Sequence, residues 1–255
     1  MQLSLLPDDR RHRVLLVDTR LRRYFGTPEQ HLLLDPVSQL VMAMIGGVTH
    51  EEVSLAAYGR LRKRFRRWEG LRDAPVAEIR DLIRAVNYPE KKAPRLKAAL
   101  QFVTASEGTL SLDFLNEKPA DAAIAWLEQI DGIGRKTSAA VLNFSTLRKP
   151  VLVIDTHHQR VAKRLGLVSR KADLAKAYDM LMPLLPSEWG ADEMDDHHQL
   201  IMLHGQRLCR PSSPSCGTCP LRDMCRYCRQ ARRSRPGCIS RPRSLARPAG
   251  FSNQT

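Results

Sequence analysis

The sequence is poor in the features that build sheets, span membranes or direct secretion. Phe, Trp and Tyr make up only 5% of the 255 residues, which is low for a β-sandwich or a β-barrel. Strand-like alternation is sparse, and no internal repeat occurs. No apolar run is long enough to cross a bilayer, and an N-terminus with Asp8, Asp9 and Arg10 lacks a signal-peptide core. We therefore expect an intracellular, cytoplasmic protein without a membrane partner.

Acidic residues are also few relative to basic ones. The chain has 41 Lys and Arg against 27 Asp and Glu, so its formal net charge is +14. Neutralised phosphates release condensed counterions on binding, which favours a polyanionic partner, although charge alone does not choose among DNA, RNA and a membrane surface. Half of the excess comes from seven arginines in residues 229–255, interleaved with Pro, Ser and Gly. We predict a disordered basic tail there, which either contacts phosphates non-specifically or only increases solubility.

Apolar residues recur at helical spacing along most of the chain, which predicts an all-α fold. Asp35 and Pro36 are typical of a helix N-cap and first helical position, and Gly46-Gly47 would end that helix. Thr49 and Glu52 form a capping-box pattern, so the next helix should begin there. Further helices are expected over 14–25, 76–86, 92–104, 120–130, 156–165, 171–184 and 195–209, with a short extended run at 151–154.

Ile130-Asp-Gly-Ile-Gly-Arg-Lys-Thr137 lies between two apolar-periodic segments and predicts a helix, a tight hairpin and a second helix. Gly132 and Gly134 would supply the break, because glycine adopts positive φ and allows a close approach of another backbone. The N–H groups that open a helix bind anions, so a nucleic-acid phosphate could rest at this turn. A single Gly-x-Gly is equally compatible with an ordinary corner between helices.

Four of the six cysteines follow the spacing Cys209-x6-Cys216-x2-Cys219-x5-Cys225. In an intracellular protein this pattern favours metal ligation over disulfides, and four thiolates in one short loop can converge on one metal centre. The spacing alone does not separate a four-iron cluster from a structural zinc site. Cys228 and Cys238 fall outside the pattern and are interpreted as spare thiols.

Three blocks in order resemble the helix-hairpin-helix DNA glycosylases, in particular the endonuclease III branch. They are residues 130–137, Val153-Ile-Asp-Thr-His-His-Gln-Arg-Val161, and His197-His-Gln-Leu-Ile-Met-Leu-His-Gly205 running into the cysteine loop. The resemblance covers about residues 30–228. It implies a helical barrel domain over 30–148, which contains the hairpin. It also implies a second domain, formed by 1–29 and 149–228, and the tail 229–255 follows that domain. The second domain would hold a 4Fe-4S cluster on Cys209, Cys216, Cys219 and Cys225.

The resemblance implies a monomeric base-excision enzyme of the nucleoid, which acts on double-stranded DNA with damaged bases or abasic sites. Lys136 matches the catalytic lysine, whose amine attacks the sugar C1′ and forms a Schiff base that permits β-elimination. Asp155 matches the catalytic aspartate, which stabilises positive charge on the sugar, and it is also a good helix N-cap. The histidines are expected to be buried or packing residues and not metal ligands: His157, His158, His197, His198 and His204.

Two loops depart from the pattern of the resembled family. A glutamine in a Ser-Ala-Gln-x-Thr-like run is expected to fill the space of an extruded base; here the run reads Gly46-Gly-Val-Thr-His-Glu51, and Val48 is placed at the glutamine. The second loop reads Val86-Asn-Tyr-Pro-Glu-Lys-Lys-Ala93, with Asn87 in place of a wedge leucine. Both changes concern lesion recognition. The expected DNA-contacting residues are thus Val48, Asn87, Gly132, Gly134 and Arg135.

Two alternative functions stay open at the level of the sequence. The altered loops are compatible with a non-catalytic DNA-binding protein derived from this fold. A monofunctional glycosylase, which removes the base without cutting the strand, is the other alternative, but that branch typically lacks a lysine at the position of Lys136.

Overall fold

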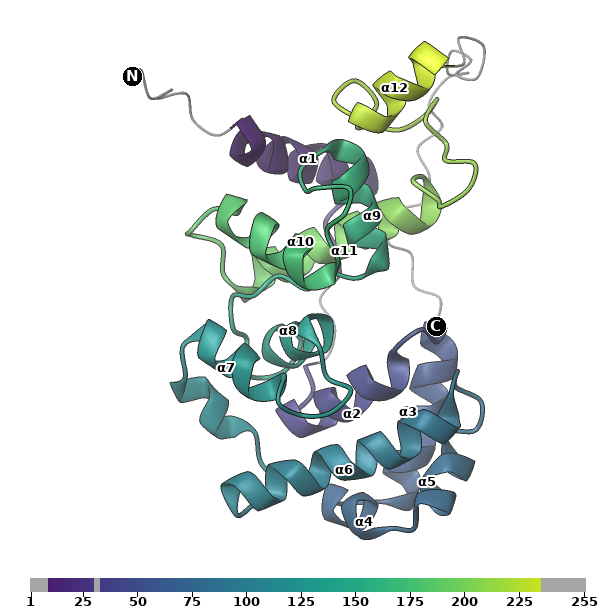
Figure 1. Ribbon diagram of the computed structural model, residues 1–255, viewed down its shortest axis with the longest axis vertical. Coiled ribbons are helices and arrows are strands. Elements are labelled where there is room, and N and C mark those ends of the chain that lie inside the picture. Colours follow the sequence, from purple (N-terminus) through teal and green to yellow (C-terminus); the bar gives the residue numbers. More distant parts are fainter. Residues whose placement is uncertain (1–8, 30–32, 235–255) are drawn as a thin grey trace. The chain divides into compact units, whose positions relative to one another are not determined.

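The computed structural model describes residues 9–29 and 33–234, and their regular elements are helices (Figure 1). Within these residues the only β pairing found is one isolated parallel bridge between Leu34 and Ser145. The prediction of an all-α fold is confirmed. No helix in this part of the chain combines the length and the apolar character needed to cross a membrane.

The chain divides into two compact units. One consists of the N-terminal segment and everything from Leu152 onward, and the other ends at Val151. These limits lie close to those expected from the sequence. We call the unit that ends at Val151 the hairpin unit. The unit that contains the N-terminal segment and the chain from Leu152 onward is the cysteine unit.

In the hairpin unit, helix α2 lies at the centre and packs against α3, α6 and α8. Most of its apolar residues are buried, among them Leu40, Val41 and Ile45, so it forms much of the core. The helices of this unit are α2 (Pro36–Gly46), α3 (Glu51–Arg64), α4 (Trp68–Asp73), α5 (Val76–Leu82), α6 (Pro89–Glu107), the short 3-10 helix η1 (Asp113–Glu117), α7 (Ala120–Leu127) and α8 (Arg135–Asn143).

The two predicted helix starts in this unit have different outcomes. Asp35 does cap α2, because its side chain accepts a hydrogen bond from the Ser38 N–H at 2.9 Å. The capping box at Thr49 and Glu52 is wrong: α3 begins at Glu51, and its N-cap residue, His50, makes no side-chain cap bond. The Thr49 hydroxyl is used elsewhere, because it bonds to the Gly47 carbonyl and to groups of a neighbouring loop.

In the cysteine unit, α11 packs against α1 and α9, and α12 packs against α9. Residues 152–154 are extended and buried beside this core, and the Val153 carbonyl bonds to the His198 ring at 2.8 Å. The helices are α1 (Asp9–Phe25), α9 (Thr156–Leu165), α10 (Leu174–Leu181), the 3-10 helix η2 (Met182–Leu184), α11 (Ala191–Arg207) and α12 (Arg226–Ser234).

The predicted start of the disordered basic tail at residue 229 is wrong. Residues 229–234 do not begin a disordered segment, because they continue helix α12. The Tyr227 ring of this helix stacks on the Arg164 guanidinium of α9, 4.6 Å from ring centroid to Cζ, so tertiary packing stabilises a helix that composition disfavours. The remainder of the tail, and Cys238 with it, lies outside the described residues.

Candidate functional site

The hairpin between α7 and α8 needs its first glycine for backbone conformation and has open space at its second. Gly132 has φ of +82°, and a Cβ added to it would come within 3.0 Å of the Arg95 Cδ. Gly134 is the N-cap residue of α8, and an added Cβ would meet no atom within 4 Å. The exposed start of α8 is therefore uncovered, as an anion site at a helix N-terminus requires.

Arg135, the first residue of α8, is paired within the protein. Its Nε lies 2.8 Å from Glu128 Oε1 on the other side of the turn. The ion pair ties the two arms of the hairpin together. A DNA phosphate at this turn would therefore compete with Glu128 for the guanidinium.

Lys136 is exposed in the first turn of α8, and a second lysine of the same unit lies near it. Burial, assisted by the positive charge of Lys136, lowers the pKa of Lys92 to about 8. The hairpin unit thus brings two amines into electrostatic range, although they are far apart in the sequence. Sequence reasoning singled out only Lys136.

Lys92 closes the loop that follows α2. Its Nζ donates to the carbonyls of Ile45 and Gly47, at 2.6 Å each, and to the Thr49 hydroxyl at 3.0 Å. The last carbonyls of a helix have no partner within the helix, and a lysine ammonium can satisfy them. The sequence did not single out Lys92, because its acceptors lie more than forty residues away along the chain.

The two loops expected to contact DNA are joined to each other. The Asn87 side-chain amide donates to the Val48 carbonyl, and the Asn87 N–H donates to the Thr49 hydroxyl at 3.1 Å. Asn87 is thus engaged with the first loop through both its side chain and its backbone.

Val48 and Tyr88 are the exposed apolar residues of these loops. Val48 is 79% exposed and Tyr88 62% exposed, and both have positive φ, which is rare for residues other than glycine. They line one hollow together with Lys91, Lys92, Arg95, Gly132 and Thr137. Tyr88 was missed by sequence reasoning, although an aromatic residue directly before Pro89 at a predicted turn was a usable signal.

Asp155 belongs to the cysteine unit, whereas Lys136 belongs to the hairpin unit. Its predicted capping role is confirmed: Oδ1 accepts the His158 N–H at 2.7 Å and so begins α9. Asp155 as a whole residue is only 9% exposed. The helix cap therefore holds the aspartate in one orientation.

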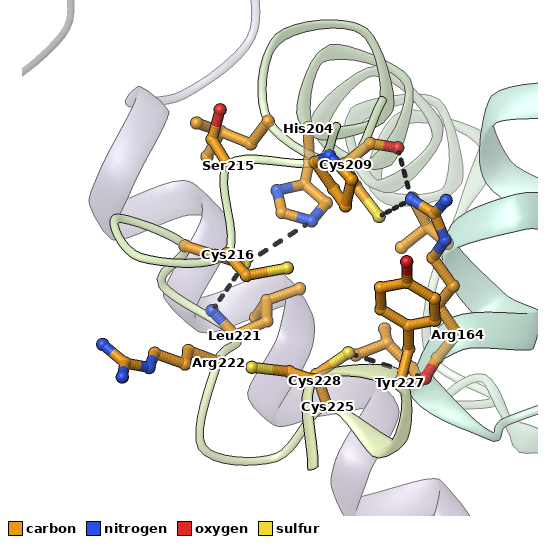
Figure 2. Close-up of a pocket in the computed structure, with 15 residues that line it drawn as sticks. Arg164, His204, Cys209, Ser215, Cys216, Leu221, Arg222, Cys225, Tyr227 and Cys228 are labelled. Atoms are coloured by element: carbon orange, nitrogen blue, oxygen red, sulfur yellow. Dashed lines mark hydrogen bonds between the residues drawn. The ribbon is translucent and has the colours of Figure 1, made fainter. Parts of the chain in front are cut away.

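The cysteine loop surrounds a pocket between α9, α11 and α12 (Figure 2). The four cysteines of the spaced pattern line it, and so does Cys228. Burial, with repulsion from neighbouring thiolates, raises the pKa of Cys216 to about 11 and that of Cys219 to about 12. Only a bound cation would keep such thiols deprotonated at neutral pH.

Hydrogen-bond donors point at the sulfur atoms of this pocket. Arg164 Nη1 lies 3.2 Å from Cys209 Sγ, and the Leu221 N–H lies 3.4 Å from Cys219 Sγ. Such donors typically surround the thiolates of iron–sulfur centres. Within the described residues, no three His, Cys, Asp or Glu side chains gather closely enough for a single metal ion. The four thiols of one pocket, with donors directed at their sulfur atoms, fit the expected iron–sulfur cluster.

Two arginines of α9 attach the cysteine loop to the helix that Asp155 caps. Arg160 Nε donates to the Cys209 carbonyl at 2.9 Å. Arg164 donates to the carbonyls of Arg210 and Pro211, at 2.7 and 2.8 Å. Sequence reasoning did not single out either arginine as an anchor, since helical spacing does not show which face meets a distant loop.

Four histidines of the resembling blocks are buried, as expected for packing residues: His158, His197, His198 and His204. His197 Nδ1 lies 3.0 Å from Asp18 Oδ1, which links α11 to α1. His204 lines the cysteine pocket, with its Nε2 3.9 Å from Cys219 Sγ.

Comparison with known proteins agrees with this geometry. The family model of the HhH-GPD superfamily base excision DNA repair proteins matches residues 41–186, and that of the iron-sulfur binding domain of endonuclease III matches residues 209–225. Endonuclease III of Thermotoga maritima is 28% identical over 204 residues, which are 80% of this chain and 88% of that protein. The DNA glycosylase/AP lyase ROS1 of Arabidopsis thaliana is 29% identical over 173 residues, 63% of this chain and 12% of its own length.

A solved structure, a trapped endonuclease III–DNA covalent intermediate, superposes with a TM-score of 0.72 at 23% identity, over 88% of this chain and 99% of that one. The fold is therefore that of the resembled family. The cysteine loop is an iron–sulfur binding domain, and the expected 4Fe-4S cofactor is confirmed. With a family model that spans more than half of its length, the chain belongs to the HhH-GPD superfamily of base excision DNA repair proteins.

Proposed function

We propose that this chain is a DNA glycosylase with abasic-site lyase activity and that Lys136 is its nucleophile. The observation that carries the proposal is an exposed lysine in the first turn of α8, directly after the glycine hairpin of a base-excision fold. The Lys136 amine attacks C1′ as the damaged base leaves, and the resulting Schiff base permits elimination of the 3′ phosphate. The monofunctional branch typically lacks a lysine at this position, so Lys136 favours the lyase.

Asp155 is proposed as the electrostatic partner of this reaction. A fixed carboxylate stabilises the positive charge that develops on the sugar, and a carboxylate that needs no reorientation does so most effectively. The helix cap on the His158 N–H supplies that fixation. Asp155 would then both cap helix α9 and stabilise the charge on the sugar.

The joined loops are proposed to contact the DNA around the extruded base. Val48 and Tyr88, the exposed pair, would enter the space that the base vacates, and Asn87 would hold the two loops together. An aromatic ring can stack on a neighbouring base, which contributes about 1–3 kcal/mol. Gly132, Gly134 and Arg135 would contact the backbone phosphate at the hairpin.

The 4Fe-4S cluster is proposed to be held by Cys209, Cys216, Cys219 and Cys225. When bound, the cluster stabilises the buried thiolates and cross-links the loop that Arg160 and Arg164 anchor to α9. Its role here is structural. Exposed Arg210 and Arg226, together with Arg222, would present positive charge to the phosphate backbone.

Borohydride trapping on duplex DNA with an abasic site tests the proposal. Wild-type protein should form a covalent adduct that survives denaturing electrophoresis, and Lys136→Ala should form none. Lys176→Ala, which changes an exposed lysine of α10, is the matched control and should trap like wild type. Absence of a wild-type adduct, or an equal adduct with Lys136→Ala, refutes the assignment.

The same protein samples separate the two alternatives. Tight duplex binding without base release on any damaged or mismatched substrate would indicate the non-catalytic protein. Base release without strand cleavage would indicate a monofunctional glycosylase. A panel of damaged bases in duplex DNA then identifies the substrate.

A further inference from the structure

Cys228 lies outside the spaced cysteine pattern but inside the cysteine pocket. It is 2% exposed and lines the same pocket as Cys209, Cys216, Cys219 and Cys225. Figure 2 shows it beside Cys225 at the start of α12. Its charge acts on the Cys216 thiol, so the two side chains are neighbours within this pocket. A fifth thiol therefore lies in the pocket of the expected cluster ligands.

We propose that Cys228 is a reserve ligand, which binds the cluster when Cys216 is lost or displaced. This proposal rests on the four-cysteine ligand set described above. No residue outside the spaced pattern is needed for a complete set of four thiolates. A fifth thiol beside one of them allows exchange without unfolding of the loop.

The scaffold around Cys228 differs from that around Cys216. Cys216 lies in an irregular loop between α11 and α12, whereas Cys228 is in the first turn of α12. Helix α12 packs against α9, where the Tyr227 ring stacks on the Arg164 guanidinium. A loop thiol can be displaced by local opening, whereas a thiol on an anchored helix stays in place.

Packing alone does not account for the number of thiols around Cys228. A buried cysteine that acts as a small apolar residue is expected among apolar side chains. Such side chains, Val161 and Leu221 among them, do line its pocket, but so do all four cysteines of the spaced pattern. The shared pocket places Cys228 within the ligand set.

The exchange is balanced without any oxidant or reductant. The Cys228 thiol releases its proton as its sulfur binds the iron. The Cys216 sulfur takes up a proton as its bond to the same iron breaks. The number of thiolate ligands and the oxidation state of the cluster are unchanged.

Iron content and visible absorbance of anaerobically purified variants test the proposal. Cys216→Ser should keep most of its iron, roughly half of the wild-type amount or more, because Cys228 completes the four-thiolate set. Cys216→Ser/Cys228→Ser should lose the cluster and its absorbance. Cys216→Ser/Cys238→Ser is the matched control, since it removes a thiol outside the pattern, and it should retain the iron of the single variant.

The outcomes distinguish failure of this proposal from failure of the ligand assignment. If Cys216→Ser loses the cluster as fully as Cys209→Ser does, Cys228 is not a reserve ligand. If the Cys216→Ser/Cys228→Ser double variant still holds the cluster, Cys216 is not a ligand, and both proposals fail.

A second measurement is independent of the folding of Cys216→Ser. In the otherwise wild-type protein, Cys228→Ser should bind the cluster but lose iron to a chelator several-fold faster, because a displaced Cys216 has no replacement. Equal rates of iron loss in Cys228→Ser and wild type would overturn the proposal.

Discussion

The Asn87 side chain donates a hydrogen bond to the Val48 carbonyl, and this bond joins the two loops at the mouth of one hollow. The residue expected to act as a wedge therefore holds the neighbouring loop in place. The exposed positions on either side of this bond are Val48 and Tyr88, both with positive φ. The sequence pattern places Asn87 at the wedge position, whereas the loop geometry makes Asn87 the link between the loops and exposes Val48 and Tyr88.

Replacement of Asn87 by alanine should loosen both loops. The change removes a side-chain hydrogen bond that contributes about 1 kcal/mol, so binding to duplex DNA with a stable abasic-site analogue should weaken about 5-fold to 10-fold. Fluorescence anisotropy measures the affinity. Asn116→Ala, at an exposed asparagine of η1, should bind like wild type. Unchanged affinity in Asn87→Ala would show that the bond does not order the loops.

Replacement of Tyr88 by alanine should impair base release more than strand cleavage. Loss of a stacking ring costs about 1–3 kcal/mol, which is about 5-fold to 150-fold in the rate of base excision from intact duplex. A preformed abasic site has no base to extrude, so its cleavage should change much less. Tyr88→Phe keeps the ring and should retain both rates. Equal loss on the two substrates would contradict a role in base extrusion.

The two roles of Asp155 can be separated by paired substitutions. Asparagine caps helices as well as aspartate does, so Asp155→Asn should leave the free energy of unfolding within about 0.5 kcal/mol of wild type. Loss of the charge should still lower single-turnover base excision by about 100-fold or more. Asp155→Ala should lose the same activity and about 1 kcal/mol of stability. Full activity in Asp155→Asn would refute the electrostatic role.

The cap of α10 supplies the control for Asp155. Asp173 accepts the Lys176 N–H at 2.8 Å in the same capping geometry, but it is exposed. Asp173→Ala should cost about 1 kcal/mol of stability and leave base excision unchanged. Chemical denaturation and single-turnover kinetics on both variants distinguish the loss of a cap from the loss of a catalytic charge.

Stability should fall as the pH drops below about 6.5. Burial, with the charges of His197 and His198, holds the pKa of His158 well below its usual 6.5. Burial also lowers the pKa of His204 to about 4. The unfolded chain takes up protons near pH 6.5 that these two folded histidines do not, so each of them should lower the free energy of unfolding by about 1.4 kcal/mol per pH unit. The Asp18 carboxylate, whose pKa lies below 3.8, titrates outside this range.

Urea denaturation of the holoprotein at pH 7.5 and 5.5 checks this pH dependence. His158→Gln should make the dependence shallower by about 1.4 kcal/mol per pH unit and leave the contribution of His204, because the variant lacks one of the two buried histidines that stay neutral in the fold. His50→Gln changes an exposed histidine and should keep the wild-type dependence. An unchanged slope in His158→Gln would assign the effect to another group.

The sequence by itself determined the features that depend on neighbouring residues. Helical periodicity predicted the helices, and the caps at Asp35 and Asp155 follow from residues three positions along the chain. The cysteine spacing and the glycine hairpin were recognisable for the same reason. Each of these features is set by contacts within a few turns of one segment.

Only the tertiary structure decided which side chains meet across the fold. Asn87 reaches Val48, Lys92 reaches the end of α2, and Arg164 reaches the cysteine loop, in each case over 39 or more residues. The capping box at Thr49 was wrong because a distant loop and a distant lysine use its hydroxyl. Likewise, α12 forms within a basic segment because Tyr227 packs on Arg164. Such pairings arise when helices pack face to face, and local sequence rules carry no information about which faces will meet.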